Sequence, residues 1–268
     1  MLSIPTPSSA DASLGTALPI AGARAGGTRT MPGAGCRIGR VRPAPALLAA
    51  AVLTLSACAS LPAAEVALPA PLASQPPELV EGIGFGRNGS FTVGTASGTF
   101  KRGRDRLELF EIVNWDSAKT RYELTLADGA RTEAACKGKA VEVTWRVLAA
   151  DARPFSFECE WRGARSAQLA VSAPALAVGL KAERKGRFTT NGVALDVQSL
   201  HEVRGSKLPL EAPIGYLFSQ GGRPVGAIEL NGPTPRLWRP AAGDALHEPV
   251  TLAALALALL WDPANRTQ

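Results

Sequence analysis

The chain has 268 residues, 46% of them hydrophobic and 19% charged, and its formal net charge is +6. This length is ample for one domain with its own hydrophobic core. Only two histidines are present, and no metal-ligand spacing or nucleophile motif occurs, so the sequence predicts no catalytic residue, no metal-binding residue and no cofactor.

Residues 31–57 have the order of a secretory signal peptide. Three arginines within residues 37–42 precede an apolar run over residues 44–55, which is the expected sequence of basic and hydrophobic regions. The run is too short to span a bilayer about 30 Å thick, which needs about 20 residues. Residues 1–30 precede this complete signal, so we interpret them as a non-native upstream extension with Met31 as the true start. A long N-terminal region is the alternative.

The signal ends in Leu55-Ser56-Ala57-Cys58, which resembles the lipobox of bacterial lipoproteins. The resemblance implies that Cys58 receives a diacylglyceryl group, incorporates palmitate and becomes the mature N-terminus, anchored to a membrane of the cell envelope. Ala59 follows, and by the enteric sorting pattern the lack of Asp at this position implies the outer membrane, facing the periplasm. The alternative is an ordinary signal with a chance cysteine nearby.

Removing residues 1–57 changes the charge. That stretch holds five arginines and one aspartate, so 24 basic and 22 acidic residues remain and the net charge falls to +2. Nucleic-acid binding depends on many Lys and Arg side chains that neutralise phosphates. We therefore expect no nucleic-acid partner.

Residues 58–77 are rich in Ala, Leu, Pro and Ser and carry one charge, Glu65. This composition predicts a flexible tether between the lipid and the domain. The remaining residues, 78–268, are predicted to form a single β-rich domain.

Alternating apolar and polar residues predict strands that bury one face. The clearest are residues 141–147 and 155–161, interpreted as a hairpin with an aromatic core face and with Asp151 at its centre. Further strands are predicted at Phe91–Val93, Leu107–Val113, Tyr122–Leu126, Gln168–Val171, Val193–Val197, Ile214–Ser219, Pro224–Leu230 and Leu237-Trp238. Turns are indicated at Asn88-Gly89, Asp128-Gly129, Gly138, Asn191-Gly192, Gly221-Gly222 and Asn231-Gly232. Together they predict a mainly β fold, an antiparallel β-barrel or sandwich.

The C-terminal part is the exception, because Leu and Ala dominate it. Pro249 suits a first helical turn and Pro263 stops continuation, so a helix is predicted over residues 249–262. Its apolar residues surround the axis, and at 1.5 Å per residue it is roughly 18 Å long, too short for a bilayer. We expect it to pack in the core of the β structure; an interfacial membrane helix is the alternative.

The segments 215–218 and 222–229, followed by the Ala/Leu helix that ends in Trp261-Asp262, resemble the tubby-like architecture shared by tubby, LURP-one-related and scramblase proteins. The resemblance covers roughly residues 215–262. It implies a β-barrel closed around a C-terminal hydrophobic helix. No lipid-phosphate ligand of tubby is carried over, because no binding residue matches here.

Of the four cysteines, Cys36 leaves with the signal and Cys58 is the lipidation site, so Cys136 and Cys159 remain. In an oxidising envelope compartment this pair is predicted to form a disulfide. The predicted hairpin puts Cys159 opposite about Thr144, so the two cysteines are expected to meet across a neighbouring strand or between layers. Two separate buried thiols are the alternative.

Lys101, Arg102, Arg104 and Arg106 form the one concentrated basic run. They are candidates for contact with anionic lipid head groups, lipopolysaccharide phosphates or an acidic partner. A solvated loop between strands is the alternative.

The leading hypothesis from sequence is a non-enzymatic envelope lipoprotein whose β-domain binds an envelope protein or a lipid ligand. A purely structural spacer is another alternative. An envelope hydrolase that uses carboxylates in a β-cleft is the alternative from a different class, with candidates Glu108, Glu111, Glu158, Glu160 and Asp196.

Overall fold

The computed structural model describes residues 65–109, 113–143, 155–173 and 181–262, with side chains except at 106–109, 113–115, 142 and 143. All belong to one compact unit, Ser60–Gln268. The predicted upstream extension, the signal peptide and Cys58 lie outside the described residues.

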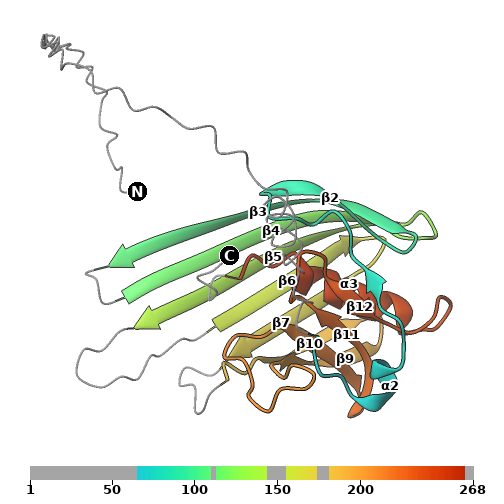
Figure 1. The fold of residues 1–268 in the computed structure, drawn as a ribbon. Helices are drawn as coiled ribbons and strands as arrows, with labels where there is room; N and C mark the ends of the chain where they lie inside the picture. Colours follow the sequence, from blue (N-terminus) through green and yellow to red (C-terminus); the bar gives the residue numbers. More distant parts are fainter. Residues whose placement is uncertain (1–64, 110–112, 144–154, 174–180, 263–268) are drawn as a thin grey trace, which may run out of the picture. The chain divides into compact units, whose positions relative to one another are not determined.

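A twelve-stranded antiparallel sheet dominates this unit and curls into a nearly closed barrel (Figure 1). From one edge to the other the strand order is β1-β12-β11-β10-β9-β8-β7-β6-β5-β4-β3-β2. A bridge between Glu81 and Thr92 links the segment after β1 to β2, so the two edges approach each other. The strands are β1 (Glu78–Leu79), β2 (Asn88–Val93), β3 (Ala96–Leu109), β4 (Val113–Thr125), β5 (Arg131–Val143), β6 (Phe155–Gly163), β7 (Ala167–Ala173), β8 (Lys185–Thr190), β9 (Val193–Leu200), β10 (Gly215–Gln220), β11 (Arg223–Glu229) and β12 (Arg236–Trp238).

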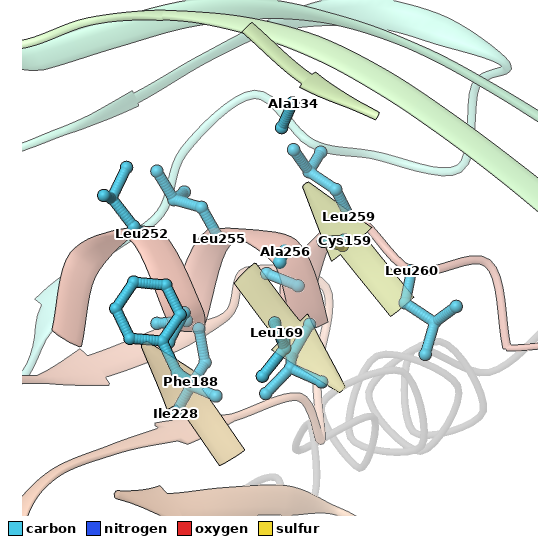
Figure 2. Packing of buried hydrophobic residues seen from close by; sticks show 14 of the residues in the cluster. Ala134, Cys159, Leu169, Phe188, Ile228, Leu252, Leu255, Ala256, Leu259 and Leu260 are labelled. Atoms are coloured by element: carbon cyan, nitrogen blue, oxygen red, sulfur yellow. The ribbon is translucent and has the colours of Figure 1, made fainter. Parts of the chain in front are cut away.

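Helix α3 (His247–Ala258) fills the inside of the curl, which confirms the predicted mainly β fold with a hydrophobic helix in its core. Every residue from Pro249 to Ala258 is buried, as a helix that is apolar on all sides requires. Figure 2 shows Leu252, Leu255 and Leu259 of this C-terminal segment among side chains of the surrounding strands, including Ala134, Leu169, Phe188 and Ile228. On β11, Gly226 leaves room for Val250, whose Cγ1 would lie only 2.5 Å from an added Cβ.

The predicted bounds of this helix, 249–262, are wrong at both ends. It begins two residues earlier, because Pro249 occupies the third helical position, where no intrahelical N–H is needed. It ends at Ala258, and the carbonyl of Leu259 accepts a hydrogen bond from Thr120 Oγ1 at 3.3 Å. Thr120 is 139 positions away in the sequence, so the local sequence could not indicate this contact. Pro263 was the only signal for the end of the helix in the residues near it.

The described part of the predicted tether, residues 65–77, does not stand free of the domain and packs against the outside of β9–β12. It contains the short helix α2 (Ala70–Ala73). Val66 and Leu72 are buried in a second apolar cluster, together with Leu200, Ile214, Ala227 and Trp238. The indole N–H of Trp238 donates to the carbonyl of Gln75 at 3.0 Å. The low-complexity composition of this segment did not indicate that Val66 and Leu72 complete the second apolar cluster.

The predicted register between the strands on either side of residues 144–154 is also wrong. Cys136 of β5 lies directly opposite Cys159 of β6, and Ala140 lies opposite Phe155. Gly138, predicted as a turn, is in the middle of β5. The cysteines therefore form their disulfide between adjacent strands and need no third strand or second layer. The inward-facing aromatic residues of β6 follow the predicted alternation.

Two other predicted elements differ. A strand over Leu107–Val113 is wrong, because Leu109 of β3 pairs with Val113 of β4 across their connection. Asn88-Gly89 begins β2 and is not a turn. The hairpin predicted around Gly221-Gly222 is confirmed by the pairing of β10 with β11. The local turn signals at Asn88-Gly89 and Gly138 are thus overridden, because both segments pair with neighbouring strands.

Removing the disulfide should destabilise the domain. The bridge joins residues 23 positions apart, and closing a loop of about this size restricts the unfolded chain by about 3 kcal/mol. The double variant Cys136→Ala/Cys159→Ala should lose that much free energy of unfolding, measured by urea denaturation followed by tryptophan fluorescence. Dithiothreitol should lower the wild-type midpoint and leave the double variant unchanged. Equal midpoints for oxidised wild type and variant would contradict the prediction.

Candidate functional site

A groove of about 1140 Å³ lies on the outer face of the sheet, across β3–β8. Side chains alternate between the core and this face along each strand. Figure 1 shows these strands side by side, and the packed N-terminal segment described above covers a different part of the sheet.

Three exposed cations line the β3–β5 side of this groove, Lys101, Arg121 and Lys137, and exposed Lys119 lies beside them opposite Lys137; we call the four the basic quartet. Lys101 is directly opposite Arg121 in the register of β3 and β4. Lys119 is directly opposite Lys137 on β4 and β5. Like charges directly opposite each other destabilise a sheet. Among the residues that the structure describes, none of the four forms an ion pair or a side-chain hydrogen bond with an acidic group.

Carboxylates flank the basic quartet. Glu158 and Glu160 of β6 line the groove, as do Glu123 and Glu133, which face each other across β4 and β5. Arg162 binds Glu160 at 2.8 Å, with both side chains largely exposed. The groove therefore has a polar, mixed-charge lining, with Lys101, Arg121 and Lys137 on its β3–β5 side and the ion-paired Arg162 and Arg187 on its β6–β8 side.

The predicted basic run does not form one surface, because successive residues of β3 face opposite sides of the sheet. Lys101 lines the groove. Arg102 is buried, and its guanidinium donates to the carbonyl of Gly84 at 2.6 Å and to that of Gly86 at 2.9 Å. Arg104 forms an ion pair with Asp116 at 3.6 Å.

Burial also lowers the pKa of Arg102. Its guanidinium lies over the rings of Phe100 and Trp261, at 5.1 and 5.4 Å from their centroids. Arg102 therefore has a structural role, and a direct contact of this side chain with an anionic surface is excluded in this fold. The side chain of Arg106 lies outside the described residues.

Sequence reasoning missed Lys119, Arg121 and Lys137. The signal that could have found them is a charged residue at every second position in residues 119–123, and again at Glu133, Lys137 and Lys139 with Ala135 as the one exception. Local sequence cannot reveal which strands become neighbours. The register of β3, β4 and β5 brings the three cations to Lys101.

The five predicted carboxylates are only partly brought together. Glu158 and Glu160 share the groove, whereas Asp196 forms an ion pair with Arg187 at 3.0 Å on the exposed surface. The side chain of Glu108 and all of Glu111 lie outside the described residues. Thus two of the five candidates share a concave surface.

A buried serine–histidine pair lies elsewhere in the fold. Ser199 Oγ accepts the backbone N–H of Arg184 at 2.8 Å and is 2.8 Å from His201 Nε2. His201 Nδ1 is 2.9 Å from the carbonyl of Leu210. Burial lowers the pKa of His201. Because both side chains are buried, this pair supports the chain locally and has no access to a substrate.

A second buried network surrounds Arg184. Its guanidinium donates to the hydroxyl of Tyr216 at 2.9 Å, pairs with Asp262 at 2.8 Å and lies 3.8 Å from the ring centroid of Phe155. Burial disfavours the charged form of Arg184, but attraction to Tyr216 and Asp262 outweighs it and raises the pKa of the guanidinium. The network fixes the chain beyond α3 against the inside of the sheet.

The described residues bring together no group of three His, Cys, Asp or Glu side chains that could hold a metal ion. Within the same ranges, no helix has the length and apolar composition that a membrane crossing requires. The fold and the groove define a barrel-like β-domain with a polar groove on its outer face. No protein-family model matches the chain, and neither a curated protein nor a solved structure matches it.

Proposed function

We propose that this protein is a cell-envelope lipoprotein, anchored through Cys58, whose β-domain is a non-enzymatic binding module. Its outer-face groove accepts an anionic glycan of the envelope, such as a phosphorylated lipopolysaccharide core. The observation that carries this proposal is the pair of opposing like charges in the basic quartet, Lys101 opposite Arg121 and Lys119 opposite Lys137; Lys137 alone of the four also has a carboxylate, Glu158, opposite it. Opposing like charges cost folding free energy, and an anionic ligand would offset that cost.

The shape of the groove supports an extended ligand. The groove is open, and side chains from neighbouring strands of the sheet line it in rows. Its described lining has no buried polar side chain to which a small ligand would be fixed. Phosphate and carboxylate groups spaced along a glycan can reach cations that lie on successive strands, which are about 4.8 Å apart. The acidic side chains on β6 would restrict the ligand's negative groups to the β3–β5 side.

The anchor is supported by the lipobox-like Leu55-Ser56-Ala57-Cys58. Ala59 favours the outer membrane, with the domain in the periplasm. The tubby-like resemblance is supported by a barrel that surrounds a C-terminal helix; it is an analogy of fold and carries no function.

Replacing Cys58 with alanine should abolish palmitate incorporation and release the protein from the membrane fraction. The measurement is metabolic labelling with radioactive palmitate, followed by membrane fractionation. Cys36→Ala is the matched control, because that cysteine precedes the predicted cleavage site and should leave labelling unchanged. Labelling that persists in Cys58→Ala would refute the anchor.

Reversing charge in the basic quartet should weaken glycan binding. For the full chain in detergent, the double variant Lys119→Glu/Lys137→Glu should bind purified lipopolysaccharide at least roughly tenfold more weakly, equivalent to about 1.4 kcal/mol. The loss should shrink as salt rises, because salt screens exposed charges. Microscale thermophoresis measures both quantities.

Lys185→Glu/Arg223→Glu is the matched control for this variant, since it makes the same change of net charge at exposed positions outside the groove. Dephosphorylated lipopolysaccharide should bind the wild type weakly. Equal affinity of both double variants for the intact glycan would count against the groove as its site.

A hydrolase is the second candidate, favoured by Glu158 and Glu160 lying together in the groove. One carboxyl could donate a proton to a glycosidic oxygen while the other activates water or attacks carbon. Purified protein incubated with envelope glycans should then release reducing ends, and Glu158→Gln/Glu160→Gln should abolish that release without abolishing binding. We expect no release from the wild type; release that the variant loses would replace the binding-module proposal.

A further inference from the structure

We infer that residues 203–210, which we call the Leu208 loop, contact the bilayer that holds the lipid anchor. Leu208 and Leu210 would enter the membrane interface, and Arg204 and Lys207 would meet anionic phospholipid head groups. This inference rests on the proposed anchoring through Cys58 and adds an orientation of the domain and a second membrane contact.

The first described residues of the chain are bonded directly to the start of the Leu208 loop. The backbone N–H of Arg204 donates to the carbonyl of Glu65 at 2.7 Å, and their side chains form an ion pair at 2.9 Å. Val66 forms a β-bridge with Val203. Glu65, the first described residue on the side of Cys58, therefore lies beside this loop.

The length of chain before Glu65 limits where the bilayer can be. Seven peptide units separate Cys58 from Glu65, and a fully extended chain of seven residues reaches at most about 25 Å. Strand β4 alone has 13 residues, which correspond to about 43 Å. A lipid on Cys58 thus keeps the membrane surface close to the side of the domain that carries Glu65.

The side chains of the Leu208 loop suit an interface between water and lipid. Leu208 is 73% exposed and Leu210 is 42% exposed, and they are two of the four large hydrophobic side chains found exposed among the described residues. Two exposed basic residues, Arg204 and Lys207, precede them in the loop. Apolar residues next to cations are typical of peripheral contacts with anionic lipids.

The nearby carboxylates do not cancel this character. Glu65 is paired with Arg204 and also with Arg236 at 3.4 Å. Glu202 is paired with Lys181 at 2.5 Å, and this contact lowers the pKa of the carboxyl and raises the pKa of the amine. Glu211 also has an interaction partner. Because Arg204 and Lys181 are themselves used in these ion pairs, Lys207 is the main cation that the loop offers to head groups.

The Leu208 loop is held by its own hydrogen bonds, so its leucines are presented in a defined position. The N–H of Ser206 donates to the carbonyl of Val203 at 3.0 Å, and Ser206 Oγ accepts the N–H of Leu208 at 3.1 Å. The N–H of Leu210 donates to the carbonyl of His201 at 2.9 Å. An ordered loop loses little conformational freedom when it docks, which favours binding.

The test measures depth in the membrane at single positions of the lipidated full chain. Leu208→Cys offers one free thiol for an environment-sensitive fluorophore, because Cys58 carries the lipid and Cys136 and Cys159 form the disulfide. Asn191→Cys is the matched control; its turn lies at the other end of β9, whose eight residues span about 26 Å. Both proteins are reconstituted in vesicles of phosphatidylethanolamine and phosphatidylglycerol that contain brominated, quenching lipids.

The expected result is a blue-shifted emission at position 208 and at least roughly twofold stronger quenching there than at position 191, as for a side chain in the apolar part of the interface. Adding Leu210→Ser and Lys207→Glu to Leu208→Cys should reduce quenching to the level at position 191. Replacing phosphatidylglycerol with neutral phosphatidylcholine should reduce it as well.

Three outcomes would overturn the inference. Weak quenching at position 208 in protein whose mass includes the lipid on Cys58 would leave the anchor standing and refute the contact. Quenching that depends on protein density and not on lipid composition would mean that a second copy covers the loop. A mature protein without lipid would refute the proposed anchor, and with it the orientation of the domain at the bilayer.

Discussion

The burial of α3 inside the curled sheet is the constraint on which the rest of the structure depends. Every residue of the helix from Pro249 onward is buried, so the helix has no stable position outside the sheet. The sheet in turn needs α3, since its inward-facing Trp161, Phe188 and Ile228 pack in the same cluster. Because the helix occupies the interior, ligands are left with the outer face.

The outer face of the sheet has two halves that differ in polarity and in whether another segment covers them. Over β9–β12 it is apolar and is covered by the N-terminal segment through Val66 and Leu72. Over β3–β8 it is polar and open, and it carries the groove. The same N-terminal segment that seals one half also places Glu65, its first described residue, beside Arg204. Covering the sheet and orienting it at a membrane would thus depend on one stretch of about ten residues.

Most of the fold class was predictable, while much of the site was not. Alternation along residues 155–161 predicted β6 and its buried aromatic face, because burial of one sheet face imposes a period of two on the residues themselves. Alternation carries no information about register. The disulfide partners were therefore predicted correctly as a pair but in the wrong geometry, and Lys119 and Lys137 went unrecognised as neighbours of Lys101.

The sequence by itself determined the β character of the domain, the all-round apolar helix, the candidate lipid site at Cys58 and the two cysteines left to pair. These are properties of composition and short-range pattern. Only the tertiary structure decided that Arg102 turns inward while Lys101 faces the groove, that Thr120 marks the end of α3, and that residues 65–77 are docked. Such choices depend on contacts between residues far apart in the chain, and their energies exist only once the sheet has closed around the helix.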